Sequence, residues 1–188
     1  MDYFQPSFYH FNQDSIEFVK WIENHFKFSK ITNVLDLCSG CGIIGLELLQ
    51  AFPEWNIDFC ELQEPFFFFF SKNSKLFFPQ RSFNYFQMDL RKFNQDSTLM
   101  YELIVCNPPY FSPNKGRLPP STERRLCRFF SEEDWNELFN CFSRSLTVEG
   151  KAYFLARTIS WKENVYVKQV GSIAGAQIFC FDLNVERS

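Results

Sequence analysis

The chain has 188 residues, a length typical of one domain, and we expect a single domain over residues 1–188. Its formal net charge of -3 excludes a uniformly basic surface, although a local basic patch is compatible with it. The longest apolar runs fall far short of the roughly 20 residues that span a bilayer, so we expect no membrane contact. Seven cysteines without a small-scaffold spacing suit a reducing compartment, so we expect a cytoplasmic location. The sequence does not fix the oligomeric state, and a monomer is the favoured expectation.

Caps, apolar spacing and turn residues predict the elements of the first half of the chain. Asp14 to Glu17 has the pattern of a capping box, and apolar residues follow it at three- and four-residue steps. The predicted elements are a helix at 14–26, a strand at 33–38, a glycine turn at 40–45, a helix at 43–52, a strand at 55–59 that ends at Cys60-Glu61, a helix that begins at Pro65, and a strand at 83–88. The Phe66 to Phe70 run lies in the helix that begins at Pro65, and we expect it in the core.

The second half of the chain continues the alternation of strands and helices. The predicted elements are a buried strand at 103–106, a long loop at 112–130, a capped helix at 131–146, a strand at 152–156 and an antiparallel pair at 165–170 and 177–183. Such alternation is typical of a parallel sheet that carries helices on both faces. The sequence therefore predicts an α/β protein whose sheet is mostly parallel and ends in an antiparallel C-terminal pair.

Three of the seven glycines, Gly40, Gly42 and Gly45, lie in one turn after the first predicted strand. Glycines in such a turn let the backbone approach a ligand closely. Their spacing also satisfies G-x-G-x-x-G, and Glu61 follows Gly42 by 19 residues, about where a dinucleotide-binding enzyme has its ribose acid. Asp36 favours S-adenosylmethionine (AdoMet), because a carboxylate there faces a pyrophosphate badly but can bind the ammonium group of a methionine moiety. A purely structural turn is the third interpretation.

Two acids follow predicted strands and are candidates for contacts with a nucleoside. Glu61 can accept hydrogen bonds from both ribose hydroxyls, and Asp89 can accept one from an adenine amino group. Either acid can equally be a solvated carboxylate at the end of a strand. Cys38 and Cys41 form C-x-x-C, but no second cysteine pair completes a zinc site, and we expect no metal.

The segment Asn107-Pro108-Pro109-Tyr110 follows the strand predicted at 103–106. An aromatic exocyclic amine is a weak nucleophile because its lone pair is delocalised into the ring. The Asn107 side-chain oxygen and the Pro108 carbonyl oxygen can accept its two N–H bonds, and the prolines hold that backbone rigid. Tyr110 offers a ring on which a flat substrate can stack. The tetrapeptide indicates methylation of an exocyclic amino group, and an ordinary turn is the alternative.

A basic patch lies in the loop predicted after this turn. Residues 113–128 hold five cations and one acid, Glu123; the cations are Lys115, Arg117, Arg124, Arg125 and Arg128. We interpret them as contacts to RNA phosphates beside the site, with incidental charge on a solvated loop as the alternative.

Three stretches resemble the class I AdoMet-dependent methyltransferases of the Asn-Pro-Pro-Tyr type, and among them the bacterial enzymes that methylate N6 of adenosine 37 in tRNA1(Val). Gln5-Pro6 with residues 9–15 is similar to the family's N-terminal cofactor segment, and residues 34–45 are similar to its glycine-loop motif. Residues 107–111, followed by the Arg-rich loop and a capped helix, are similar to its catalytic region. One departure is Phe129-Phe130, where relatives tend to carry His-Glu.

The resemblance implies a Rossmann-like seven-stranded sheet, AdoMet as the cofactor and tRNA as the substrate. The implied cofactor contacts are Tyr9, Phe11, Asp14, Asp36, Gly40, Gly42, Glu61 and Asp89. The implied catalytic residues are Asn107, Pro108, Pro109 and Tyr110. The substrate contacts expected beside them are Phe111, Lys115, Arg117, Arg124, Arg125 and Arg128.

Related enzymes with the same tetrapeptide act on other acceptors, which are the alternatives here. They methylate N2 of rRNA guanine, N6 of DNA adenine, or N5 of a glutamine amide in release factors. A glutamine amide offers the same NH2 group to Asn107 and Pro108, although a separate recognition domain is expected in a release-factor enzyme. A non-catalytic scaffold with the AdoMet fold is a further alternative, and the intact acceptor and cofactor residues count against it.

Overall fold

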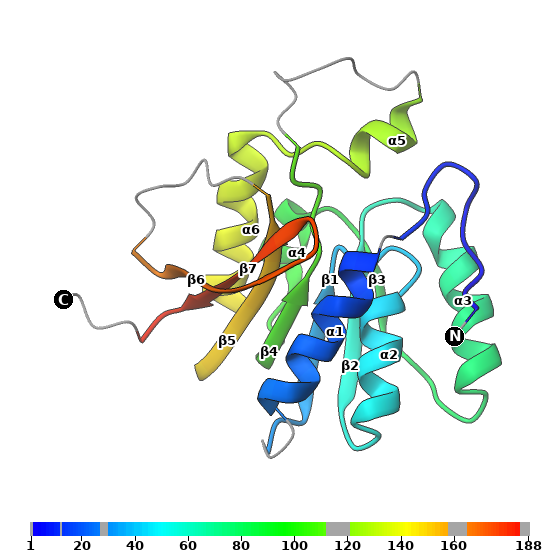
Figure 1. Cartoon of the computed structure of the whole chain (residues 1–188), viewed down its shortest axis with the longest axis horizontal. Coiled ribbons are helices and arrows are strands. Elements are labelled where there is room, and N and C mark those ends of the chain that lie inside the picture. The colour runs from blue at the N-terminus through cyan, green and yellow to red at the C-terminus, as the bar shows by residue number, and fades with distance from the viewer. Residues whose placement is uncertain (1, 12, 27–29, 112–120, 158–164, 185–188) are drawn as a thin grey trace.

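A seven-stranded sheet forms the centre of the molecule (Figure 1). The computed structural model describes residues 2–11, 13–26, 30–111, 121–157 and 165–184. The strands are β1 Asn33–Leu37, β2 Asn56–Glu61, β3 Tyr85–Gln87, β4 Tyr101–Cys106, β5 Leu146–Ala156, β6 Val167–Ile173 and β7 Ala176–Asp182. Their order across the sheet is β3-β2-β1-β4-β5-β7-β6.

The predicted mixture of parallel and antiparallel pairing is confirmed. β3, β2, β1, β4 and β5 are parallel neighbours, and β7 pairs antiparallel with both β5 and β6. Asp36 of β1 lies in register between Phe59 of β2 and Val105 of β4. Because these strands are parallel, their carboxyl ends meet at one edge of the sheet, where the glycine turn and the Asn107 turn leave it.

Helices cover both faces of the sheet, as predicted (Figure 1). They are α1 Gln13–Phe26, α2 Ile43–Ala51, α3 Pro65–Phe77, α4 Leu90–Asp96, α5 Thr122–Leu126 and α6 Glu132–Ser145. The first three contribute to one apolar cluster, and α6 with Phe93 of α4 contributes to the other. Successive residues of β1 alternate between them, since Val34 joins the first cluster and Leu35 the second.

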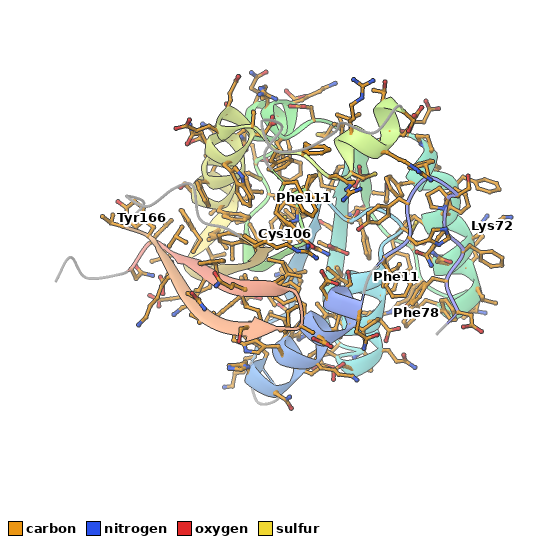
Figure 2. All side chains as sticks on the ribbon, turned by 45° about the horizontal axis from the view of Figure 1, so that its top comes forward. Phe11, Lys72, Phe78, Cys106, Phe111 and Tyr166 are labelled. Carbon is orange, nitrogen blue, oxygen red and sulfur yellow. The ribbon has the colours of Figure 1, made fainter. Side chains whose placement is uncertain are left out.

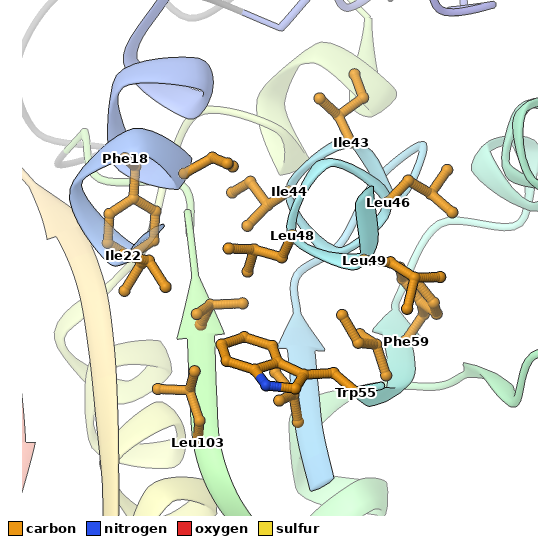
Figure 3. Close-up of a cluster of buried hydrophobic side chains, with 14 of the residues drawn as sticks. Phe18, Ile22, Ile43, Ile44, Leu46, Leu48, Leu49, Trp55, Phe59 and Leu103 are labelled. Atoms are coloured by element: carbon orange, nitrogen blue, oxygen red, sulfur yellow. The ribbon is translucent and has the colours of Figure 1, made fainter. Parts of the chain in front are cut away.

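The core between α1, α2 and the sheet is largely aliphatic (Figure 3). Side chains from three different elements are fully buried there, among them Phe18, Leu48 and Leu103. The expectation that the phenylalanine run lies in the core is right for Phe66 and Phe70, which are 2% and 3% exposed. Phe67 and Phe68 are on the outer side of α3, at 47% and 57%.

Helix α5, Thr122–Leu126, lies within the segment 112–130 that was predicted as a loop. The prediction was therefore wrong for the residues of this helix. The Ser121 side chain caps α5 by accepting a hydrogen bond from the Arg124 N–H at 3.2 Å. The helix buries none of its residues, and apolar periodicity therefore could not reveal it. The short helix α4 was also missed; its cap is Asp89, whose side chain accepts from the Arg91 N–H at 2.7 Å.

The capping box predicted at the start of α1 is not observed. The helix begins at Gln13, and both acids of the pattern have partners from distant parts of the chain. Asp14 accepts a hydrogen bond from the Tyr110 hydroxyl at 2.9 Å, and Glu17 accepts one from the Ala174 N–H at 2.9 Å. The two carboxylates that the local pattern assigned to a capping box thus form tertiary hydrogen bonds instead.

Strand β5 begins at Leu146, earlier than the predicted start at residue 152. Its pairing with β4 shifts register between Tyr101 and Leu103, which leaves extra residues of β5 around Gly150. A Cβ at Gly150 would lie 2.8 Å from the Tyr101 carbonyl oxygen, so a glycine is needed there. Within the described ranges, no helix has the length and apolar character needed to cross a membrane.

Candidate functional site

A pocket lies at the carboxyl edge of the sheet, between the N-terminal segment, the glycine turn, the Asn107 turn and the α5 region. Several predicted cofactor residues line it: Tyr9, Phe11, Gly40, Glu61 and Asp89. Asn107 and Pro109 of the predicted catalytic turn line the same pocket. The structure therefore brings both groups together, although they are far apart in the sequence.

The glycine turn, residues 38–45, forms one wall of the pocket. Gly40 and Gly42 have φ angles of 54° and 77°, a left-handed conformation that favours glycine. A Cβ at Gly42 would lie 2.5 Å from the ring of Phe70, so packing against α3 also requires a glycine there. Gly42 thus lies behind the pocket wall, whereas Gly40 faces the pocket.

Glu61 ends β2 and is 8% exposed. Its Oε2 accepts the Gly40 N–H and its Oε1 accepts the Gln63 N–H, both at 2.9 Å. Burial raises the pKa of the Glu61 carboxyl, and the backbone N–H groups of Gln63, Gly40 and Leu62 oppose that rise. Each carboxylate oxygen keeps a second lone pair, so Glu61 can also accept from a hydroxyl pair in the pocket.

Asp36 lies beneath the glycine turn and is fully buried. Its Oδ2 accepts the Gly45 N–H at 2.8 Å, while its buried Oδ1 has no hydrogen-bond partner among the described residues. Burial, opposed by the Gly45 hydrogen bond and reinforced by the charge of Glu61, raises the pKa of Asp36 to about 7. Asp36 is not among the lining residues, so any contact with a bound molecule would have to pass through water or a rearranged turn.

The pKa of Asp36 gives a prediction for the stability of the protein without ligand. The folded state holds a proton on Asp36 up to about pH 7, whereas an unfolded chain loses it near pH 4. Folded molecules therefore bind more protons between these values, and the free energy of unfolding decreases as pH rises through that window. The decrease is at most about 1.4 kcal/mol for each unit of pKa difference.

Asp36→Asn removes this titration but keeps an oxygen that can accept the Gly45 N–H. We expect the free energy of unfolding, measured with denaturant from pH 5 to pH 8, to decrease less in the variant than in the wild type. The raised pKa of Glu61 changes the free energy of unfolding with pH in the same direction. The difference between the wild-type and variant curves of this free energy against pH therefore gives the contribution of Asp36. Parallel curves would show that Asp36 is ionised throughout this range.

The Asn107 turn follows β4 directly, at the carboxyl edge of the sheet. The Asn107 side-chain nitrogen donates to the Ser15 hydroxyl at 3.1 Å. This bond orients the amide and leaves its oxygen as the acceptor on a residue that lines the pocket. Pro108 is buried beside it, so the two prolines fix the backbone that carries the neighbouring carbonyl oxygen.

Tyr110 is held by contacts on its hydroxyl and on its ring. The hydroxyl donates to Asp14 Oδ2 at 2.9 Å, and the ring packs at 5.4 Å from the ring of Phe111. Burial and the Asp14 carboxylate raise the pKa of Tyr110 to about 12, against the opposing effect of Arg157. Asp14 itself is 5% exposed and does not line the pocket, so its observed contact is with Tyr110.

The aromatic residues of the N-terminal segment close another side of the pocket. Tyr9 and Phe11 both line it, and the Tyr9 ring meets the Phe66 ring edge-on at 5.9 Å. The Phe11 N–H donates to the Gln5 side-chain oxygen at 2.8 Å, and this hydrogen bond links two ends of the N-terminal segment. Asp89 lines the pocket from the end of β3 while its carboxylate caps α4.

The structure describes three of the five predicted basic residues, all in or next to α5. Lys115 and Arg117 lie outside the described residues. Arg124 and Arg125 are exposed on α5, and Arg128 is exposed with its guanidinium 5.1 Å from the centre of the Phe111 ring. Among the described residues, no group of three or more His, Cys, Asp or Glu side chains could hold a metal ion.

Several pocket residues were not predicted from the sequence. Gln63 donates to the Cys127 sulfur at 3.2 Å, and its buried Oε1 has no partner among the described residues. Leu126, Phe129 and Phe130 also line the pocket. The segment that carries these three residues is held near the pocket by Phe111 and Phe129, which pair as an isolated β-bridge. No local pattern signals this contact, although Ser15 could have been suspected from its place in the N-terminal segment.

Residues 16–119 of the chain match the methyltransferase small domain family. The tRNA1(Val) (adenine(37)-N6)-methyltransferase of Yersinia pestis (strain Pestoides F) is 30% identical over 118 residues, which cover 62% of this chain and 47% of that protein. The enzyme of the same name from Yersinia enterocolitica is 30% identical over 122 residues, with coverages of 64% and 48%. The chain thus spans about half the length of these curated relatives.

Solved structures share the fold at low sequence identity. An O-methyltransferase family protein from Burkholderia thailandensis superposes with a TM-score of 0.66 at 12% identity, over 90% of this chain and 56% of that one. TrmN from Thermus thermophilus gives 0.60 at 15% identity, over 87% and 47%. A precorrin-6y C5,15-methyltransferase from Geobacter metallireducens gives 0.62 at 12% identity, over 95% and 92%. The predicted Rossmann-like sheet is confirmed.

Proposed function

The chain belongs to the methyltransferase small domain family, and from this premise we propose that it transfers a methyl group from AdoMet to N6 of an adenine in tRNA. The observation that carries the proposal is the meeting of Asn107 with the glycine turn and Glu61 in one pocket. In the proposed reaction, this pocket would hold the cofactor beside the Asn107 oxygen that accepts the amino hydrogens. The resemblance to the Yersinia adenine-N6 enzymes supports the choice of adenine and of tRNA.

The pocket residues fit AdoMet chemically. Glu61, with its carboxylate held by two backbone N–H groups, can accept from the two ribose hydroxyls. Asp89 at the end of β3 can accept from the adenine amino group, and the Tyr9 and Phe11 rings add apolar contact area. The buried oxygens of Ser39 and Gln63, without partners among the described residues, are further polar atoms for a bound ligand.

AdoMet, when bound, supplies an electrophilic methyl group on a sulfonium. The residues of the chain orient the acceptor amine and stabilise the positive charge that develops on it. The Asn107 side-chain oxygen and the Pro108 carbonyl oxygen accept its two N–H bonds, and the Ser15 hydroxyl holds the Asn107 amide in that orientation. Tyr110, held by Asp14, keeps a ring beside the turn for stacking on the base.

Charge reversal of Arg124 and Arg125, the exposed arginines of α5, tests whether RNA is the acceptor. We expect Arg124→Glu with Arg125→Glu to weaken tRNA binding and to lower the slope of log affinity against log salt by about 0.7 to 0.9 for each phosphate that is no longer neutralised. AdoMet affinity should be unchanged, because neither arginine lines the pocket. Binding can be measured by fluorescence anisotropy of labelled tRNA between about 50 and 200 mM salt.

Arg144→Glu is the matched control for this reversal. Arg144 is exposed in the last turn of α6, next to the amino end of β5 and therefore at the opposite edge of the sheet. Its reversal changes net charge without changing the proposed RNA surface. Equal losses of tRNA binding in the two variants would contradict a specific role of α5. Methyl label that enters glutamine side chains of a protein fraction and no RNA would make a glutamine amide the acceptor.

A further inference from the structure

Arg157 is an exposed arginine beside the Asn107 turn that no sequence pattern predicted as a site residue. It directly follows Ala156, the last residue of β5, which is the neighbour of β4 in the sheet. Its guanidinium carbon lies 5.4 Å from the centre of the Tyr110 ring and 5.2 Å from that of the Phe111 ring. Phe111 itself lies beyond Cys106, at the carboxyl end of β4 (Figure 2).

Arg128 reaches the same phenylalanine from a different segment. Its guanidinium carbon is 5.1 Å from the centre of the Phe111 ring. Two backbone hydrogen bonds fix this segment, from the Phe111 N–H to the Arg128 carbonyl at 2.9 Å and from the Phe130 N–H to the Phe111 carbonyl at 3.1 Å. The Phe111 ring is therefore in contact with two guanidinium groups, whose backbones are held by the sheet and by this pairing.

Within the described ranges, Arg157 and Arg128 lack carboxylate partners that would neutralise them. The carboxylate of Asp14, near Tyr110, already accepts the Tyr110 hydroxyl. Arg157 also forms a side-chain hydrogen bond with the Tyr110 hydroxyl. A guanidinium has five N–H donors, so others remain at its edge, and its planar fork matches the oxygens of a phosphate.

We propose that Arg157 and Arg128, whose guanidinium groups both contact the Phe111 ring, bind the backbone phosphates next to the acceptor nucleotide. This inference rests on the proposed function, because it assumes that the acceptor is a nucleotide. Its consequence is that two phosphate contacts beside the Asn107 turn hold the nucleotide while its base reaches the pocket. The contacts read the backbone and carry no base specificity.

The test uses Arg157→Gln, Arg157→Lys and Arg128→Gln in the full chain, with Arg144→Gln as the control at the opposite edge of the sheet. Binding of labelled tRNA is measured between about 50 and 200 mM salt, and AdoMet affinity is measured separately. We expect Arg157→Gln and Arg128→Gln each to weaken tRNA binding about tenfold. Each should also lower the salt slope by about 0.7 to 0.9. Arg157→Lys should keep the slope, since lysine retains the charge, and AdoMet affinity should not change.

The outcomes separate this inference from the proposed function. A wild type that methylates and binds tRNA, together with Arg157→Gln whose tRNA affinity and salt slope match those of Arg144→Gln, would overturn the phosphate contacts alone. A wild type that neither binds nor methylates RNA would overturn the proposed function, and the inference with it. If Arg157 only supports Tyr110, Arg157→Gln would lower kcat with an unchanged salt slope, and this result also contradicts the proposal.

Discussion

Asn107→Ala is expected to lower kcat for methyl transfer by roughly a hundredfold to a thousandfold while AdoMet affinity is retained. The reason is that the amide oxygen stabilises charge that develops on the amine only during the reaction, so its removal raises the barrier without weakening cofactor binding. The fold should survive, because Asn107 is only half-buried and, among the described residues, its side chain donates one hydrogen bond, to Ser15. Single-turnover transfer of labelled methyl groups to tRNA measures the effect.

Ser15→Ala is the matched variant for this prediction. It removes the hydroxyl to which the Asn107 nitrogen donates at 3.1 Å but leaves the amide in place. We expect a smaller decrease of kcat than for Asn107→Ala, since the amide is then poorly oriented but still present. A variant Asn107→Ala that transfers methyl groups at the wild-type rate would rule out the amide oxygen as the acceptor of the amine hydrogens.

Glu61→Gln is expected to weaken AdoMet binding by about ten- to a hundredfold. The carboxylate accepts the N–H groups of Gly40 and Gln63 with its two oxygens. A glutamine would turn an NH2 group toward one of these donors, which disturbs the glycine turn and removes an acceptor for the ribose hydroxyls. Isothermal titration calorimetry with AdoMet provides the affinity.

Glu64→Gln is the control, because Glu64 is exposed and lies three residues further along the same connection. It removes the same charge from the same region without touching the turn, and its AdoMet affinity should equal that of the wild type. Thermal unfolding of both variants without AdoMet distinguishes a weakened ribose interaction from a damaged turn. If Glu61→Gln bound AdoMet as tightly as Glu64→Gln does, the ribose contact would be excluded.

The features that the sequence predicted well are local. Gly40 and Gly42 follow a short buried strand, and left-handed backbone at both positions explains why glycines stand there. The tetrapeptide at residues 107–110 is likewise a continuous segment, and its place after β4 follows from the apolar run before it. The alternation of strands and helices predicted a mostly parallel sheet but not the order of its strands.

The features that the sequence did not predict depend on distant partners. Asp14 and Tyr110 are 96 residues apart, so their hydrogen bond could not be distinguished from a helix cap by a local pattern. Ser15 and Asn107 are separated by 92 residues, and their contact was missed for the same reason. Arg157 became a candidate only when the sheet placed the end of β5 beside the Phe111 ring. Such contacts follow from the topology and not from the spacing of residue types.

Mass spectrometry of nucleosides from tRNA incubated with the protein and isotopically labelled AdoMet tests the proposed adenine methylation most directly. With the wild type we expect the label in N6-methyladenosine, and with Asn107→Ala we expect its near absence at equal protein concentration. Label confined to a guanine nucleoside, or no labelled nucleoside at all, would contradict the proposed acceptor.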